Sequence, residues 1–183
     1  MRVLKFIIDS EVLPMKRIAK FEKVSFNQFL DAWTDAFGTD KDAAAVYDSI
    51  KLPRRATTGS AGYDFYAVND ICLKPGETAK IPTGIRVRID EGWVLKIYPR
   101  SGLGFKFRLQ LNNTVGIIDS DYYFSDNEGH IFIKITNDSN ENKTVNIRQG
   151  EGFAQGIFIE YGITVDDDVT EIRNGGFGST TKK

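Results

Sequence analysis

Alternation of hydrophobic and polar residues dominates the chain from about residue 52 onward. The stretch IRVRI (85–89) alternates isoleucine and valine with arginine, and HIFIKITN (130–137) alternates isoleucine with polar neighbours. A period of two is typical of a strand with one buried face. Turn residues recur about every ten residues, as in KPGE, DEGW and QGEG, and this is the spacing of an all-β sandwich or barrel. We therefore expect an all-β domain in this part of the chain.

A helical pattern precedes the strands. The large apolar residues of KVSFNQFLDAWTDAFG recur at helical spacing on one face: Phe26, Phe29, Leu30, Trp33 and Phe37. Ser25 and Gln28 form a candidate capping box at its start, and Gly38 is a candidate stop signal. The stretch TDKDAAAVYDSI predicts a second, shorter helix, and RVLKFIID and RIAKFEKV predict strands before both helices.

These patterns divide the chain into three parts. Residues 1–51 form one or two strands and a helical appendage, residues 52–172 form the β domain, and residues 173–183 form a C-terminal arm. The arm, RNGGFGSTTKK, has a composition that favours disorder. Its glycines would also let backbone N–H groups approach a ligand closely, because glycine has no Cβ.

Composition narrows the function classes. A net charge of -1 gives no basic surplus, so we expect no nucleic-acid partner. A single cysteine, Cys72, excludes an intramolecular disulfide and suits a reducing compartment. Cys72 lies in the strand-like stretch DICLK, where we expect a buried structural thiol. The apolar run at the N-terminus is broken by Asp9 and Glu11, so we expect no membrane span and a cytoplasmic protein.

The loop PRSGLG (99–104) could bind phosphate. Backbone N–H groups, the Ser101 hydroxyl and the Arg100 guanidinium are suitable donors, although an ordinary turn is the simpler interpretation. In EGFAQGIF (151–158), Gln155 lies within an apolar strand and needs a partner there, either from the protein or from a ligand.

Two carboxylates follow an apolar strand in NNTVGIIDSDYY (112–123). Asp119 and Asp121 could bind a metal, activate a water molecule or cap a turn. Asn113 carries an amide that suits either a base edge or a turn. Each of these stretches is a weak signal when it is considered by itself.

Together with GSAGYDFYA (59–67) and GGFGST (175–180), these stretches resemble, in order, the five motifs of the trimeric dUTPase family. The resemblance runs from Leu52 to Thr181. It implies an antiparallel β barrel of jelly-roll type and a homotrimer whose active sites are shared between subunits. It also implies hydrolysis of dUTP to dUMP and pyrophosphate, with Mg2+ bound through the substrate phosphates and water.

The resemblance assigns roles to individual residues. Asp119 matches the acid that activates the attacking water, and Tyr122 matches the tyrosine that packs on the deoxyribose and excludes a 2'-hydroxyl. The matches to the uracil-reading hairpin are Asn113, Gly116 and Ile118. The matches to phosphate-binding positions are Arg100, Ser101, Gly102 and Gln155. In the arm, Phe177 matches the aromatic residue that stacks on uracil, and the matches to γ-phosphate binders are Arg173, Gly178, Ser179 and Thr180. Asp64 matches a position that serves either structure or a metal-bound water.

Three features depart from the family pattern. Many members have one more residue between the arginine and GGFG, so Arg173 could reach differently. The turn after DYY is lengthened to FSDNEGH, which carries the only histidine, His130; we expect this to be a loop or strand-start residue rather than a catalyst. The helical segment at about 24–50 resembles longer dUTPases of Gram-positive bacteria and their phages. We expect its apolar face to pack on the barrel, with a surface for a protein partner as the alternative.

Two other functions fit parts of the sequence. Deoxycytidine triphosphate deaminase resembles dUTPase in fold, but its deamination motif is not visible, and the IDSDY acid and the GGFGST arm favour the hydrolase. A nucleotide-gated regulatory protein is the second alternative, with the helical segment and the FSDNEGH loop as its contact surfaces.

Overall fold

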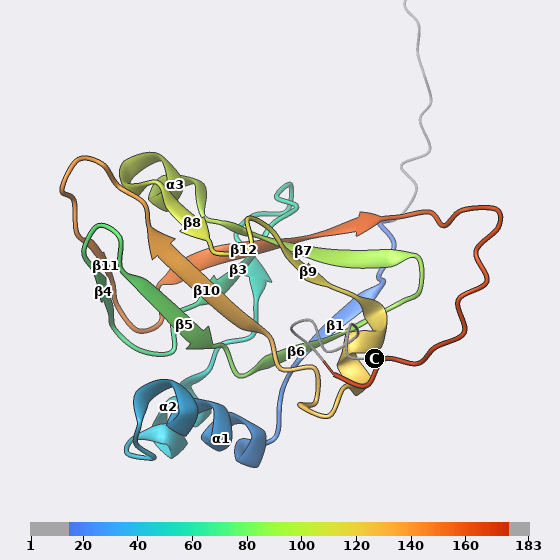
Figure 1. The fold of residues 1–183 in the computed structure, drawn as a ribbon, viewed down its shortest axis with the longest axis horizontal. Helices are drawn as coiled ribbons and strands as arrows, with labels where there is room; N and C mark the ends of the chain where they lie inside the picture. The colour runs from blue at the N-terminus through green and yellow to red at the C-terminus, as the bar shows by residue number, and fades with distance from the viewer. Residues whose placement is uncertain (1–14, 176–183) are drawn as a thin grey trace, which may run out of the picture.

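The computed structural model describes residues 15–175, in which twelve strands, three α-helices and one 3-10 helix occur (Figure 1). The strands are β1 (Ala19–Lys23), β2 (Arg54–Arg55), β3 (Tyr63–Tyr66), β4 (Ile71–Leu73), β5 (Thr78–Pro82), β6 (Ile85–Ile89), β7 (Trp93–Pro99), β8 (Leu109–Leu111), β9 (Gly116–Ile118), β10 (Phe132–Asn137), β11 (Val145–Ile147) and β12 (Gly152–Glu160). The helices are α1 (Phe26–Phe37), α2 (Ala43–Ser49), α3 (Ser101–Phe107) and the 3-10 helix η1 (Ser120–Phe124). The predicted strand RVLKFIID and four predicted arm residues, Phe177, Gly178, Ser179 and Thr180, lie outside the described residues.

The described strands pair only in antiparallel fashion, which confirms the all-β prediction. The largest sheet has the order β2-β3-β12-β7-β9, and a second sheet has the order β5-β10-β8. Two further pairs, β1-β6 and β4-β11, complete the set within residues 15–175. The strands therefore surround one hydrophobic core, but their hydrogen-bonded ladders do not close into a single barrel.

Buried and exposed side chains alternate along most strands, as the sequence predicted. On one strand this alternation contradicts an expectation about a cysteine. On β6, Ile85, Val87 and Ile89 are all buried. On β4, Ile71 and Leu73 are buried, whereas Cys72 between them is exposed. The prediction of a buried thiol was therefore wrong, because successive side chains on a strand point to opposite faces.

The helical segment packs on the strands rather than standing apart. Phe29 and Trp33 of α1 and Val46 of α2 belong to the same buried cluster as the strand residues, which confirms the expected packing. Figure 1 shows both helices together beside the ends of β5 and β6. The fit is close at Gly84, where φ is +69° and an added Cβ would lie 2.4 Å from Ile50 Cδ1. None of the described helices is long and apolar enough to cross a membrane.

The ends of α1 follow the predicted signals with one difference. The Ser25 hydroxyl accepts a hydrogen bond from the Gln28 N–H at 3.2 Å, and Gly38 ends the helix in the left-handed conformation. The backbone N–H of Ser25 donates to Glu128 rather than to Gln28, at 2.7 Å. The reciprocal half of the capping box therefore comes from a loop that lies about 100 residues away in the sequence.

Candidate active site

The first group of predicted site residues lies where β7 passes into α3. Arg100 immediately precedes α3, and the exposed residues Ser101 and Gly102 begin it. Gln155 on β12 lies opposite Tyr98 of β7, and its amide donates to the Pro99 carbonyl at 3.2 Å. A cavity of about 640 Å³ is lined by Arg100, Ser101 and Gln155 together with apolar neighbours. The structure therefore brings together the four predicted phosphate-binding residues.

Arg100 is held from two sides. Its Nε lies 3.3 Å from Asp64 Oδ1, and its Nη1 donates to the Gly152 carbonyl at 3.3 Å. An added Cβ at Gly152 would lie 2.8 Å from Arg100 Nη1, so only glycine allows this approach. The contact with Asp64 gives that carboxylate a structural role, one of the two roles expected for it. The guanidinium is thereby positioned at the rim of the cavity.

The second group of predicted residues lies around the end of β9. Asp119 precedes η1, and Tyr122 within η1 is buried. A small cavity of about 70 Å³ is lined by Ile118, Asp119, Tyr122 and Arg173 with three apolar neighbours. Burial is the main cause that raises the pKa of the Tyr122 phenol, so its hydroxyl stays protonated at neutral pH.

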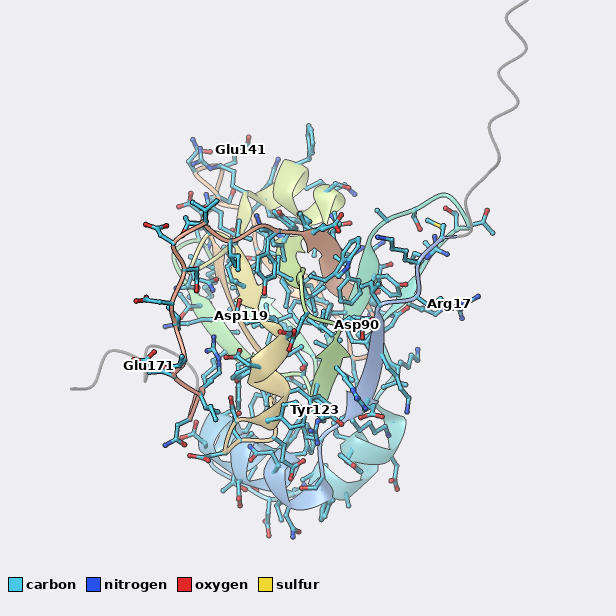
Figure 2. All side chains as sticks on the ribbon, turned by 90° about the vertical axis from the view of Figure 1, so that its right-hand side faces the viewer. Arg17, Asp90, Asp119, Tyr123, Glu141 and Glu171 are labelled. Carbon is cyan, nitrogen blue, oxygen red and sulfur yellow. The ribbon has the colours of Figure 1, made fainter. Side chains whose placement is uncertain are left out.

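Arg173 joins both carboxylates of this group. Its Nη2 lies 2.5 Å from Asp119 Oδ2, and its Nε lies 2.8 Å from Asp121 Oδ1. The two acids of the IDSDY stretch thus converge on one guanidinium. Figure 1 shows the route: the chain after β12 loops away from the sheet and returns beside η1. Figure 2 shows Asp119 and Tyr123 on one face of the molecule, with Glu171 of this returning segment at its side.

The predicted uracil-reading residues occupy the turn between β8 and β9. Asn113 is exposed in this turn, and the N–H of Val115 donates to its carbonyl at 2.6 Å. Gly116 is buried opposite Ile97, and an added Cβ would lie 3.1 Å from Ile97 Cβ. The turn is therefore packed tightly against β7 while the Asn113 side chain stays accessible.

The two groups lie far apart within one chain. Ile118 pairs with Leu95 of β7, so Asp119 is level with Val94. Arg100 lies six residues further along the same strand direction. At about 3.3 Å per strand residue, this places Arg100 and Asp119 roughly 20 Å apart. The two groups of predicted site residues are therefore separate from each other within the described chain.

A family model described as dUTPase matches residues 48–181. The deoxyuridine 5'-triphosphate nucleotidohydrolase of Lactococcus lactis is 43% identical over 134 residues, covering 72% of this chain and 88% of the relative. The chain belongs to the dUTPase family.

Other dUTPases agree with this assignment. An Escherichia coli relative of the same name is 40% identical over 146 residues, covering 75% of this chain and 92% of the relative. The dUTPase of Streptococcus mutans has a similar structure, with a TM-score of 0.57, 33% identity, and coverage of 79% of this chain and 97% of that one. A dUTPase from phage phi11 of Staphylococcus aureus reaches a TM-score of 0.57 at 23% identity, covering 85% of this chain and 98% of that one, and shares the fold.

His130 is buried within this dUTPase fold. Its Nε2 accepts a hydrogen bond from the Gly84 N–H at 2.9 Å, and Phe29 and Phe132 flank its ring. Burial lowers its pKa from 6.5 to about 4. The imidazole is therefore neutral near pH 7 and faces the core, and His130 lies in the loop just before β10, as expected.

The family resemblance assigns no role to three polar residues around the site. Asp121 shares Arg173 with Asp119, Asn127 donates to the Tyr122 hydroxyl at 2.8 Å, and Glu128 accepts from Ser25. The longer FSDNEGH loop departs from the family pattern, but its composition does not indicate which of its polar residues face the site. Within residues 15–175, no group of three or more His, Cys, Asp or Glu residues could hold a metal ion.

Proposed function

We propose that the chain hydrolyses dUTP to dUMP and pyrophosphate, thereby removing dUTP and supplying dUMP for thymidylate synthesis. The observation that carries this proposal is the family match over residues 48–181, which includes Asp119 beside the buried Tyr122. The Asp119 carboxylate is accessible and lines the small cavity, so it could act as a base on a molecule bound there.

Asp119 is the proposed general base. Its ionised carboxylate accepts a proton from water while the water oxygen attacks the α-phosphorus. The bond between the α-phosphorus and the bridging oxygen breaks, and pyrophosphate leaves with the bonding electrons. Phosphoryl transfer depends mainly on positioning and charge neutralisation, and Arg100, Ser101, Gly102, Gln155 and Arg173 are the groups proposed to hold the phosphates.

Substrate selection is assigned to the β8–β9 turn and to Tyr122. Asn113 with the backbone of Gly116 and Ile118 would pair with uracil, and a site left with unpaired polar groups would reject cytosine. Tyr122 would lie against the deoxyribose and leave no room for a 2'-hydroxyl. Phe177 would stack on the base, while Gly178, Ser179 and Thr180 would hold the γ-phosphate as the arm closes over the nucleotide.

A homotrimer with shared sites is part of the proposal. The roughly 20 Å between Arg100 and Asp119 along the β7–β9 ladder supports it, because a second chain must supply one of the two groups to any one triphosphate. Large apolar side chains on the surface support it too. Phe105 beside the first cavity is 93% exposed, and Ile117 beside the second is 51% exposed.

Mg2+ is the proposed cofactor, and it would neutralise charge on the triphosphate. Mg2+ keeps several of its waters in proteins and binds readily to substrate phosphates. It would be held through the substrate phosphates and water, with no protein side chain as a direct ligand. A cytoplasmic location is proposed as well, which the single cysteine supports.

Pyrophosphate release from dUTP, dCTP, dTTP and UTP in the presence of Mg2+ tests the function. We expect rapid release from dUTP and slow release from the other three nucleotides. Release of ammonia from dCTP, without pyrophosphate from dUTP, would show that the chain is a deaminase instead.

A further inference from the structure

The hydroxyl of Tyr122 makes two hydrogen bonds inside the protein. It donates to the His130 carbonyl at 2.8 Å and accepts from Asn127 Nδ2 at 2.8 Å. A phenol oxygen can donate only once, so the second bond requires a donor such as an amide. With the His130 carbonyl as its only partner, the Tyr122 hydroxyl could pivot about that bond. The second hydrogen bond, from Asn127, fixes the position of the hydroxyl and so of the ring.

Asn127 is itself held within the loop between η1 and β10. Its Oδ1 accepts from the Gly129 N–H at 3.2 Å, and its carbonyl accepts from the His130 N–H at 3.0 Å. Gly129 has φ +70°, and an added Cβ there would lie 2.7 Å from the Tyr122 carbonyl oxygen. The loop thus folds directly onto the helical turn that carries Tyr122.

Glu128 ties the same loop to the helical segment. Its carboxylate accepts from the N–H of Ser25 at 2.7 Å and from the Ser25 hydroxyl at 2.6 Å, and it lies 3.8 Å from Arg86 Nη1. Both Ser25 groups belong to the start of α1. Glu128 and Asn127 are neighbours in the chain, so hydrogen bonds on either side of one peptide bond connect the start of α1 with Tyr122.

We propose that Asn127 is a positioning residue that sets the discrimination between deoxyribose and ribose by orienting Tyr122, and that the helical segment holds it in place through Glu128. This inference rests on the proposed contact between Tyr122 and the sugar. A tyrosine ring that pivots leaves space where the 2'-hydroxyl of UTP would otherwise clash. The helical segment then has a role at the nucleotide site.

The readout is the ratio of kcat/KM for dUTP to kcat/KM for UTP, which does not depend on the fraction of folded enzyme. Asn127→Leu keeps the approximate size of the side chain and removes the donor to Tyr122, whereas an aspartate could still accept from the Tyr122 hydroxyl. Tyr122→Phe removes the hydroxyl itself. We expect Asn127→Leu to lower the ratio by roughly fivefold, the worth of one hydrogen bond, and Tyr122→Phe, which breaks two, to lower it by at least as much. Because both changes break the same bond, the double variant should match Tyr122→Phe alone.

Asn146→Leu on the exposed face of β11 is the matched control and should keep the wild-type ratio. Glu128→Gln, which can no longer accept from both Ser25 groups, should lower the ratio by about twofold. An unchanged ratio in Asn127→Leu, or a drop of the same size with and without the Tyr122 hydroxyl, overturns the role of Asn127. An unchanged ratio in Glu128→Gln overturns the role of the helical segment. A wild-type chain that releases no pyrophosphate from dUTP contradicts the proposed function instead.

Discussion

Arg173 forms an ion pair with Asp119, the proposed general base, at 2.5 Å, while its Nε binds Asp121 at 2.8 Å. The guanidinium therefore lies against the carboxylate on which the proposed reaction depends. Arginine binds phosphate as readily as carboxylate, through the same planar set of donors. A bound triphosphate would compete for Arg173 and release Asp119 to accept a proton from water.

Removal of the arm should abolish most activity without unfolding the protein. A chain ending at Ile172 keeps every described strand and helix and loses only the partly exposed ion pairs of Arg173, so we expect little change in Tm. We expect kcat/KM for dUTP to fall by at least about 100-fold, the usual loss when a preorganised donor to the transition state is removed. A chain lacking only Lys182 and Lys183 is the control and should stay active. Full activity after truncation at Ile172 would remove the arm from the mechanism.

Shared sites can be tested by complementation. Arg100→Ala and Asp119→Asn should each be nearly inactive alone, since each removes one partial site from every subunit. Co-expressed chains should form mixed trimers in which intact Arg100 of one chain meets intact Asp119 of another, and activity should reappear. Activity no higher than the sum of the separate variants would contradict the sharing, as would a stable monomer in light scattering.

The packing of the helical segment on the strands predicts a stability difference between two glycines. Gly84 and Gly92 both have positive φ, +69° and +81°, but only at Gly84 would a Cβ meet neighbours, Ile50 and Phe29. Gly92→Ala should cost about 1 kcal/mol of unfolding free energy for backbone strain alone. Gly84→Ala should cost about 2 kcal/mol more, the typical penalty of overpacking. Equal costs in urea unfolding would mean that the helices do not pack on Gly84.

Buried His130 predicts an acid-sensitive fold. Its folded pKa is about 4 and its ordinary value is 6.5, so the unfolded chain binds a proton between these values that the folded protein does not. Stability should therefore fall as the pH drops from 6.5 towards 4, by about 3 kcal/mol from this group. In His130→Gln, which can still accept from Gly84, unfolding free energies should lose this part of the pH dependence. The same pH slope in both proteins would assign the effect to other groups.

The sequence predicted most of the elements because their signals are local. Alternation of apolar and polar residues predicted β6 and β10. The helical spacing of Phe29 and Trp33 predicted α1, and the glycine at position 38 predicted its end. Cys72 is exposed because it lies between two inward-facing residues, and the apolar character of a thiol does not indicate on which face of a strand it lies.

The missing parts of the site depend on long-range contacts. Glu128 completes the cap of α1 from a loop about 100 residues later in the sequence, and Asn127 reaches Tyr122 because Gly129 folds the loop back. The convergence of Asp119 and Asp121 on Arg173 likewise joins residues more than 50 positions apart. Spacing in the sequence carries no record of such contacts.

The central claim is that Asp119 takes the proton from the attacking water. Asp119→Asn keeps the size of the side chain and removes its basicity, so nucleotide binding should persist while turnover is lost. Single-turnover pyrophosphate release from dUTP with Mg2+, measured beside binding of dUTP, separates the two. We predict wild-type affinity within a few-fold and a rate at least about 100-fold lower, the scale of general-base catalysis. An Asp119→Asn variant that releases pyrophosphate at the wild-type rate would contradict the account.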